Sequence, residues 1–219
     1  MLKIKDLLDL NNTIAVHLFD DKTYPWEVLP EIGDFIIKLG EKLDLSTYDK
    51  IDNNIWKSKS ATIADTAFIS GPCIIGHNTE VRHCAFIRGT VIVGENCVVG
   101  NSTELKNSIL FNYVQVPHFN YVGDSILGFK SHMGAGSITS NVKSNKSLVD
   151  IKINNEVIKT NRKKVGAILG DFVEVGCNSV LNPGTVIGRN TDIYPLSNVR
   201  GFINSNCIYK DKDNIISKI

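Results

Sequence analysis

The sequence predicts an all-β protein built as a parallel β-helix, with a small helical N-terminal appendage and one ejected β-hairpin. Three observations carry this prediction: an aliphatic residue recurs at every sixth position, small or turn-forming residues follow it, and one stretch alternates with period two instead. Each six-residue unit is expected to form a short strand that ends in a tight corner. Three such units then make one triangular coil of about 18 residues.

The six-residue repeat is strict in two series, which are joined by a less regular part. The first series comprises Ile63, Ile69, Ile75, Val81, Ile87, Val93, Val99 and Leu105, and the second comprises Leu169, Val175, Leu181, Ile187, Ile193 and Val199. Between them the register continues through Leu110, Val116, Val122, Leu127 and Met133, with two five-residue steps. These side chains are expected to fill the prism, with coils about 4.8 Å apart. The short steps and breaks are where we look for function.

Residues 142–164 interrupt the repeat and predict the hairpin. Their apolar residues alternate around Asn154-Asn155, which predicts a two-residue turn. The stretch holds seven Lys and Arg residues against one Asp and one Glu. Two interpretations remain open: a solvated hairpin, or a basic arm that reaches a phosphate-bearing ligand.

The first 55 residues do not repeat and predict the helical appendage. One helical face would carry Val28, Ile32, Phe35, Ile36, Leu39 and Leu43. We expect residues 1–55 to cover the open end of the prism, because an uncovered end exposes apolar side chains and unpaired strand edges. Residues 56–219 then form the β-helix domain.

Composition limits the classes of partner. The 219 residues carry a formal net charge of +1, which gives no overall reason to expect nucleic acid or an anionic membrane. The N-terminus lacks the pattern of a signal peptide, and no apolar run is long enough to cross a bilayer. The five cysteines show no CxxC spacing, which favours reduced thiols. The sequence therefore predicts a cytoplasmic protein that binds neither nucleic acid nor membrane.

Arg88 and Lys106 form the first candidate site. They lie 18 residues apart, directly after core positions, so both are expected to project from one face on successive coils. Two adjacent cations are unfavourable unless an anion lies between them, and a ligand phosphate would be such an anion. The alternative is that the side chains turn into solvent or pair with Glu80 or Glu104.

His118 and Tyr121 follow about one coil later. Asp124 is close enough in sequence to orient or polarise the imidazole, which could then act as a base. A structural histidine is the alternative. Metal binding is not expected, because the spacings of His77 and His83, and of His118 and His132, do not fit the zinc pattern of hexapeptide carbonic anhydrases.

The stretch ELKNSILFNYVQVPHFNYVGDSILGFKSHMGAGSITSN carries a family resemblance. With its H-x-x-Y-x-G-D motif, it resembles the acetyltransferase domain of bifunctional UDP-N-acetylglucosamine pyrophosphorylase/glucosamine-1-phosphate N-acetyltransferases. The resemblance implies a left-handed β-helix, a homotrimer with active sites between adjacent prisms, and acetyl-CoA as co-substrate. The N-terminal segment is too short for the pyrophosphorylase domain and lacks its glycine-rich loop, so a stand-alone acetyltransferase unit is expected.

The resemblance also assigns roles to the acceptor side of the site. His118 matches the family's base, Arg88 and Lys106 match its phosphate ligands, and Tyr121 matches its substrate-contacting tyrosine. Asn141 matches an asparagine that orients the amine or the histidine, and so is a second catalytic candidate.

The coenzyme side matches less completely. Lys164 matches a family lysine, and backbone N–H groups around Gly134 and Ala135 are candidate oxyanion donors and coenzyme contacts. His132 replaces an asparagine that touches the sugar, which leaves the identity of the sugar open. Cys177 replaces a coenzyme-contacting serine.

The resemblance implies an acyl-CoA-dependent N-acyltransferase that acetylates the amine of an amino-sugar phosphate similar to glucosamine-1-phosphate, with no metal required. The alternative is a non-catalytic hexapeptide prism, an oligomerisation or regulatory module related to sugar nucleotidyltransferases. The matching Arg88, Lys106, His118, Tyr121 and Asn141 favour the enzyme, and His132 favours the module.

Overall fold

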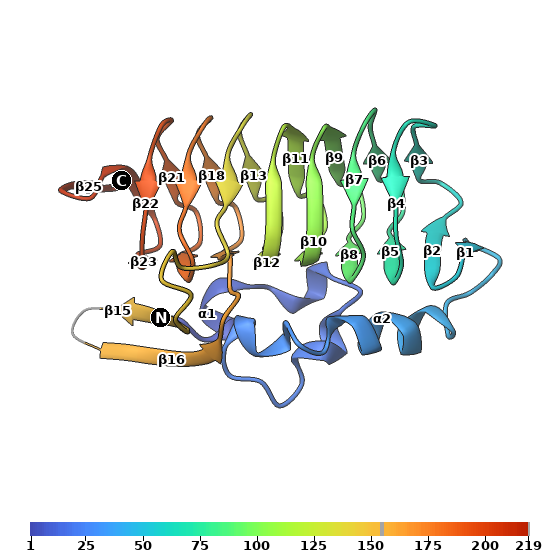
Figure 1. Cartoon of the computed structure of the whole chain (residues 1–219), viewed down its shortest axis with the longest axis horizontal. Coiled ribbons are helices and arrows are strands. Elements are labelled where there is room, and N and C mark those ends of the chain that lie inside the picture. The colour runs from blue at the N-terminus through green and yellow to red at the C-terminus, as the bar shows by residue number, and fades with distance from the viewer. Residues whose placement is uncertain (154–155, 219) are drawn as a thin grey trace.

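The computed structural model describes residues 1–153 and 156–218. It confirms the predicted parallel β-helix, which winds through about eight turns (Figure 1). Parallel strands pair coil on coil, and each coil contributes one short strand to each of three faces. We call these faces 1, 2 and 3, in the order in which the chain crosses them.

The strands divide among the faces as follows. Face 1 comprises β3 (Thr62–Ile63), β6 (Glu80–Val81), β9 (Val98–Asn101), β11 (Gln115–His118), β13 (His132–Met133), β18 (Glu174–Val175), β21 (Asp192–Ile193) and β24 (Cys207–Asp211). Face 2 comprises β4 (Phe68–Ile69), β7 (Phe86–Ile87), the first parts of β10 (Glu104–Leu110) and β12 (Tyr121–Leu127), β14 (Ile138–Thr139), β19 (Val180–Leu181) and β22 (Asn198–Val199). Face 3 comprises β2 (Ile55–Ser58), β5 (Cys73–Ile75), β8 (Val91–Val93), the second parts of β10 and β12, β17 (Ala167–Leu169), β20 (Thr185–Ile187) and β23 (Phe202–Ile203).

The six-residue repeat forms the interior, as predicted. From Ile75 to Val199 every aliphatic residue of the repeat is at most 3% exposed, whereas Ile63 and Ile69 in the first coil are partly buried. At the two five-residue steps, β10 and β12 each continue from face 2 to face 3 as one strand. The shortened corners carry Asn107 and Asp124 at positive φ angles of 46° and 50°.

Face 3 is buried on its outer side as well. Because side chains alternate along a strand, the middle residues of the face 3 strands point away from the interior. Five of them are nevertheless 0% exposed: Ile74, Ile92, Ile109, Ile126 and Ile168. A strand that is buried on both sides is apolar at consecutive positions, and this explains runs such as CII and VIV.

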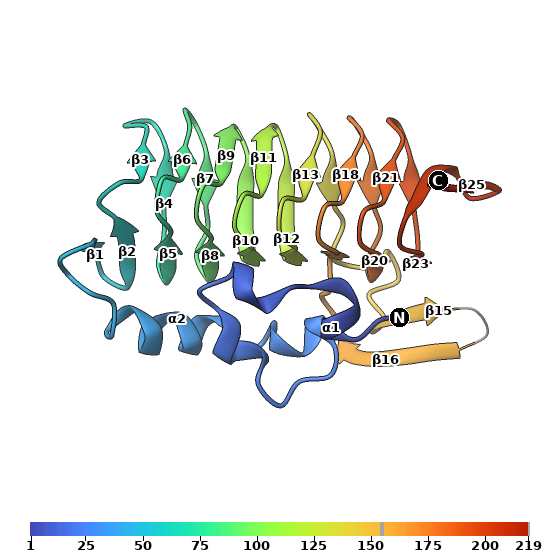
Figure 2. The same ribbon diagram turned by 180° about the vertical axis from the view of Figure 1, so that it is seen from behind.

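The N-terminal segment covers most of face 3. It comprises α1 (Ile4–Leu7), the 3₁₀ helices η1 (Leu10–Asn12), η2 (Val16–Phe19) and η3 (Pro25–Val28), and α2 (Ile32–Gly40). Helix α2 packs on β5, β8 and β10, and η3 packs on β12. The expectation that the helices of this segment cover the open end of the prism is therefore wrong: they lie along a side, against the outward isoleucines of face 3 (Figure 2).

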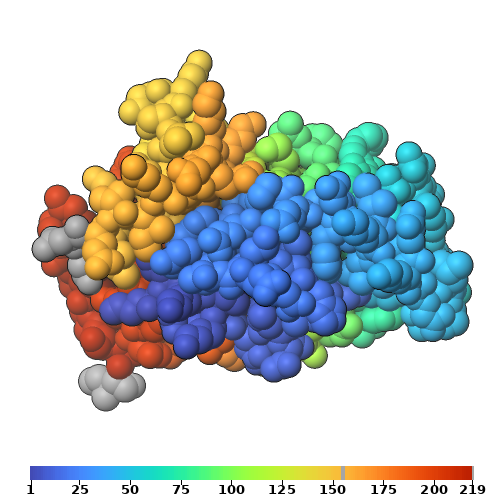
Figure 3. All heavy atoms as spheres, turned by 90° about the horizontal axis from the view of Figure 1, so that it is seen from below, coloured from blue at the N-terminus to red at the C-terminus, as the bar shows by residue number. Residues whose placement is uncertain are grey.

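The predicted hairpin is present as the antiparallel pair β15 (Val149–Ile153) and β16 (Glu156–Arg162). Its predicted turn at Asn154-Asn155 lies outside the described residues. Val149 and Ile151 are 0% exposed, and β15 contacts β23. The hairpin thus continues the cover of face 3 beside the N-terminal segment, as the space-filling view from that side shows (Figure 3).

Antiparallel strands border both ends of the β-helix. At one end β1 (Tyr48–Asp52) pairs with β2, and at the other β25 (Asn214–Ser217) pairs with β24. Each added strand satisfies a strand edge that would otherwise be open. Among the described residues, no helix is long and apolar enough to cross a membrane.

Candidate functional site

His118 ends β11 at the corner between faces 1 and 2. Phe119 turns this corner at a φ of 51°, and Tyr121 begins β12 on face 2. The backbone of His118 is fixed, because its N–H donates to Asn120 Oδ1 (3.1 Å) and its carbonyl accepts from the N–H of Gly136 (3.0 Å). The side chain itself is exposed.

The imidazole of His118 differs from those of the other four histidines. Each of those rings bonds a neighbouring side chain: His17 with Asp20 (3.1 Å), His77 with Ser58 (2.6 Å), His83 with Thr66 (2.6 Å) and His132 with Glu174 (2.8 Å). Within residues 1–153 and 156–218, the His118 ring has no hydrogen-bond partner. It is free to exchange a proton with a ligand, which is what a general base requires.

Asp124 gathers several of the predicted site residues. It is 3% exposed, and its carboxylate accepts hydrogen bonds from Lys106 Nζ (3.2 Å), Asn107 Nδ2 (2.8 Å) and Asn141 Nδ2 (2.6 Å). Asn141 Nδ2 also donates to the hydroxyl of Tyr121 (3.2 Å). Residues far apart in sequence are thus joined in one network at the corner between faces 2 and 3, across face 2 from the corner that carries His118.

Asp124 and Asn141 do not act on the imidazole as expected. In the part of the chain that the structure describes, neither side chain bonds to His118, so the expected orientation of His118 by Asp124 is wrong. Because Asp124 lies in a buried, shortened corner, its carboxylate points to Lys106, Asn107 and Asn141 instead. Asn107 was missed by sequence reasoning, although its place at the first five-residue step was a usable signal.

Arg88 and Lys106 lie side by side on face 2, as predicted, since β7 and β10 pair in parallel register. Both cations already have carboxylate partners: Arg88 bonds Glu104 (2.7 Å), as the alternative interpretation had it, and Lys106 bonds Asp124. The bond to Glu104 raises the pKa of Arg88, so the guanidinium stays charged. A phosphate that binds here must compete with these two carboxylates.

Tyr121 stays a neutral phenol at ordinary pH. Partial burial raises the pKa of its hydroxyl, and the negative charges of Glu104 and Asp124 act in the same direction. Because its oxygen accepts from Asn141, its O–H proton is available to donate to a ligand oxygen.

Most backbone N–H groups of the Gly134–Gly136 turn are already used. The N–H of Gly134 donates to the carbonyl of Val175 (2.7 Å), and that of Gly136 donates to His118. Neither is therefore free to bind an oxyanion, which corrects the expectation for this turn. Among the described residues, the N–H of Ala135 has no backbone or side-chain acceptor, so it is the remaining candidate.

Two coenzyme-side candidates lie near this turn and near Asn141. Cys177 is exposed one coil beyond Gly134, and a Cβ atom added to that glycine would lie 2.8 Å from the Cys177 nitrogen. Lys164 is exposed at the point where the hairpin rejoins the prism. There the N–H of Val165 donates to the carbonyl of Asn141 (3.1 Å).

His132 lies apart from the Asp124 network. It begins β13 on face 1 and lines a hollow of about 290 Å³ with Tyr113, Gln115, Lys130 and Glu174. Tyr121 and Asn141 belong to face 2 and its corner. The structure therefore does not bring His132 together with the other predicted acceptor residues within one chain.

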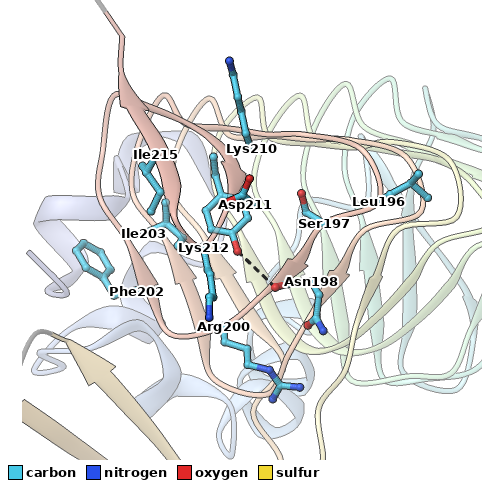
Figure 4. A pocket seen from close by; sticks show the side chains of 11 residues that line it. Leu196, Ser197, Asn198, Arg200, Phe202, Ile203, Lys210, Asp211, Lys212 and Ile215 are labelled. Carbon is cyan, nitrogen blue, oxygen red and sulfur yellow. Dashed lines mark hydrogen bonds between the residues drawn. The ribbon is translucent and has the colours of Figure 1, made fainter.

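A larger hollow lies near the C-terminal end of the prism (Figure 4). It measures about 580 Å³, and its charged lining residues are Arg200, Lys210, Asp211 and Lys212. Apolar side chains, including Leu196 and Ile215, complete it. Sequence reasoning missed this hollow, because its residues come from separate strands and match no motif.

The corner that carries His118 leads to this larger hollow. One backbone hydrogen bond joins each coil to the next along the corner: Gly136 to His118 (3.0 Å), Asn178 to Ala135 (2.8 Å) and Leu196 to Cys177 (2.9 Å). Leu196 itself lines the hollow and is 79% exposed. The free imidazole and the basic hollow are thus two points on one continuous corner.

Comparison with known proteins confirms the predicted resemblance. The chain is 33% identical over 197 residues to the bifunctional protein GlmU of Methanococcus maripaludis, an alignment that covers 86% of this chain and 47% of that protein. It is 32% identical over 214 residues to a bifunctional sugar-1-phosphate nucleotidylyltransferase/acetyltransferase of Sulfurisphaera tokodaii, covering 89% and 53% respectively. The chain spans about half the length of these curated relatives.

Likeness to solved structures is more distant. A hexapeptide transferase family protein from Anaplasma phagocytophilum is 15% identical with a TM-score of 0.42, covering 75% of this chain and 80% of that one. Residues 69–190, more than half of the chain, match the family model described as the GMPPB C-terminal domain. Because this family model matches more than half of the chain, the chain belongs to the GMPPB C-terminal domain family.

Proposed function

We propose that this chain transfers an acetyl group from acetyl-CoA to the amine of an amino-sugar phosphate, with His118 as the general base. The observation that carries the proposal is the free imidazole at one edge of face 2, with the Tyr121, Asn141 and Asp124 network on the same face. The name of the Sulfurisphaera tokodaii relative, a bifunctional sugar-1-phosphate nucleotidylyltransferase/acetyltransferase, supports the same reaction class.

The acceptor phosphate would bind on face 2. Arg88 and Lys106 supply positive charge, and the Tyr121 hydroxyl supplies a neutral donor. Glu104 and Asp124 hold the two cations in place until a dianionic phosphate takes over part of their hydrogen bonding. Binding the phosphate on this face puts the rest of the sugar near the corner where His118 projects.

The chemistry is an addition followed by an elimination. The neutral amine attacks the thioester carbonyl, a C–N bond forms, and His118 accepts the proton that the amine loses. The C–S bond then breaks, and the leaving thiolate takes that proton as CoA thiol. The N–H of Ala135 is the candidate donor to the developing oxyanion, and holding both reactants together supplies much of the rate enhancement.

The coenzyme would follow the corner from His118 toward the C-terminal hollow. From the His118 coil to the Leu196 coil there are three steps, or roughly 14 Å at the usual strand spacing. An extended pantetheine arm passing Ala135 and Cys177 would bring the coenzyme phosphates to Arg200, Lys210 and Lys212. Lys164 is a further cation near the reacting end.

A homotrimer fits the distribution of covered and bare surface. The N-terminal segment and the hairpin cover face 3, so the strands left bare for a neighbouring prism are those of faces 1 and 2. The corner between these two faces carries His118. A partner prism packed there would close the coenzyme path into a groove and exclude water from the thioester.

The test is thiol release from acetyl-CoA in the presence of glucosamine-1-phosphate. We expect turnover by the natural protein and its loss in His118→Asn, while the control His17→Asn, which changes an exposed histidine on the N-terminal segment, remains active. Equal turnover in the natural protein and His118→Asn would overturn the assignment of His118.

One observation favours the non-catalytic module. Arg88 and Lys106 are both satisfied by carboxylates without any ligand, as they would be in a purely structural prism. Acetyl-CoA separates the two functions, because a ligand that binds only the folded state raises its melting temperature. No thermal shift with acetyl-CoA and no turnover with any amino-sugar phosphate would favour the module.

A further inference from the structure

Two phenylalanines lie side by side on the open surface of face 2. Phe68 on β4 is 63% exposed and Phe86 on β7 is 38% exposed. Their ring centroids are 5.8 Å apart, with an interplanar angle of 60°. A paired aromatic surface left in water is a common mark of a binding site.

This aromatic pair is in line with the proposed acceptor site. Strand pairing places Phe68 beside Phe86, Phe86 beside Glu104, and Glu104 beside Tyr121. The coils of Phe68 and Tyr121 are three steps apart, or roughly 14 Å along the prism. Phe86 therefore lies on the coil of Arg88, and Phe68 lies one coil beyond it, on the side away from the C-terminal hollow.

Arg88 connects the aromatic pair to the anion site. Its guanidinium carbon lies 5.9 Å from the centroid of Phe86, and the same group bonds Glu104 (2.7 Å). Along face 2 the order is thus a phenol at Tyr121, the cations Lys106 and Arg88, and then two flat apolar rings.

We propose that the acceptor is a nucleotide-linked amino sugar, whose base stacks on Phe86 and Phe68. This inference rests on the proposed function and extends it. The diphosphate would meet Arg88 and Lys106, and the sugar amine would reach His118. An amino-sugar nucleotide presents its amine, sugar, diphosphate, ribose and base in that order. The residues that would bind the amine, the diphosphate and the base follow one another along the prism in the same order.

The charge next to the rings favours a nucleotide over a second copy of the chain. A protein interface would bury the Arg88–Glu104 ion pair together with the rings, at a desolvation cost, whereas a diphosphate offers Arg88 a stronger partner. Base stacking on aromatic side chains tolerates any base, so the structure selects the class of ligand and not the particular base.

Binding of nucleoside diphosphates tests the aromatic surface without acyl transfer. Titration calorimetry with UDP, dTDP and GDP is expected to show binding to the natural protein that is tighter than binding of inorganic pyrophosphate. The double variant Phe68→Leu/Phe86→Leu should weaken nucleoside diphosphate binding by about 10-fold or more. The control Phe172→Leu changes an exposed phenylalanine on another corner and should leave binding unchanged.

Kinetics separates this inference from the proposed function. If acetyl transfer occurs, the double variant should raise KM for UDP-glucosamine about 10-fold, with little change in kcat or in KM for glucosamine-1-phosphate. Acetylation of glucosamine-1-phosphate without tighter binding of any nucleoside diphosphate would overturn the nucleotide surface and leave the proposed function standing. Nucleoside diphosphate binding that depends on the rings, with no acetylation of either acceptor, would support the nucleotide surface and overturn the proposed acetyl transfer.

Sedimentation velocity tests whether a second copy of the chain, rather than a nucleotide, covers the two rings. The double variant is expected to keep the oligomeric state of the natural protein. Dissociation of the assembly in Phe68→Leu/Phe86→Leu would show that a second copy covers the rings, and would overturn the proposal.

Discussion

Faces 2 and 3 both point aliphatic residues of the repeat into the prism, and β10 and β12 run through both, yet their outer sides differ. On face 3 five of the outward positions are isoleucines with no exposure, and the N-terminal segment and the hairpin cover this face. On face 2 the corresponding positions are Phe68, Phe86, Glu104 and Tyr121, all at least partly exposed. The outer side of face 3 thus binds the N-terminal segment and the hairpin, whereas the outer side of face 2 is left available for a ligand.

The difference teaches where stability and function reside. Removing apolar side chains from face 3 should change the free energy of unfolding, whereas polar changes on face 2 should change binding and rate. Both faces have buried aliphatic residues on their inner sides, so the interior does not distinguish them. Variants on the two outer sides therefore test the comparison directly.

The largest effect is expected at the corner of face 2. His118→Asn removes the proposed base, and kcat/KM for acetyl transfer should fall about 100- to 10,000-fold. Because the His118 side chain bonds no described residue, the melting temperature should change little. A large loss of stability in this variant would show that the ring is structural.

The second largest effect is expected on face 3. Ile92→Ala on β8 removes a fully buried side chain beneath α2, and the free energy of unfolding should fall by about 2–5 kcal/mol. Val180→Ala changes an outward, partly exposed residue of face 2 and should cost about 1 kcal/mol or less. Chemical denaturation measures both, and equal losses would remove the distinction between the faces.

A smaller effect is expected at Asp124. Asp124→Asn replaces the carboxylate that accepts from Lys106, Asn107 and Asn141, and should cost about 1–3 kcal/mol of stability. It should also raise KM for the acceptor, because Lys106 and Asn141 lose their shared partner. Asp192→Asn is the matched control, since its partly exposed pair with Lys218 is worth about 1 kcal/mol or less.

The smallest effect is expected at Glu104. Glu104→Gln removes the charge that competes with a phosphate for Arg88, so KM for the acceptor should fall by roughly 2- to 5-fold. Steady-state kinetics at low salt measures this change. A rise in KM instead would indicate that Glu104 itself contacts the acceptor.

Sequence reasoning found the core and several members of the site, and it failed where side chains meet across coils. The resemblance placed Lys106, Tyr121 and Asn141 in one site, but the hydrogen bonds that join Lys106 and Asn141 through Asp124 were not predicted. Asp124 was expected at His118, because sequence proximity does not show which way a side chain leaves a shortened corner. His132 was named with the acceptor residues but lies on face 1 with Glu174.

The sequence by itself determined the β-helix, because a six-residue period leaves each aliphatic side chain only one interior to enter. It also determined where the regular coils are broken, at the two five-residue steps and at residues 142–164. Only the tertiary structure decided which outer side is covered. The six-residue period shows which residues share a face of the prism, but not which segment of the chain covers that face. The apolar N-terminal segment reaches face 3 through contacts between residues far apart in the chain.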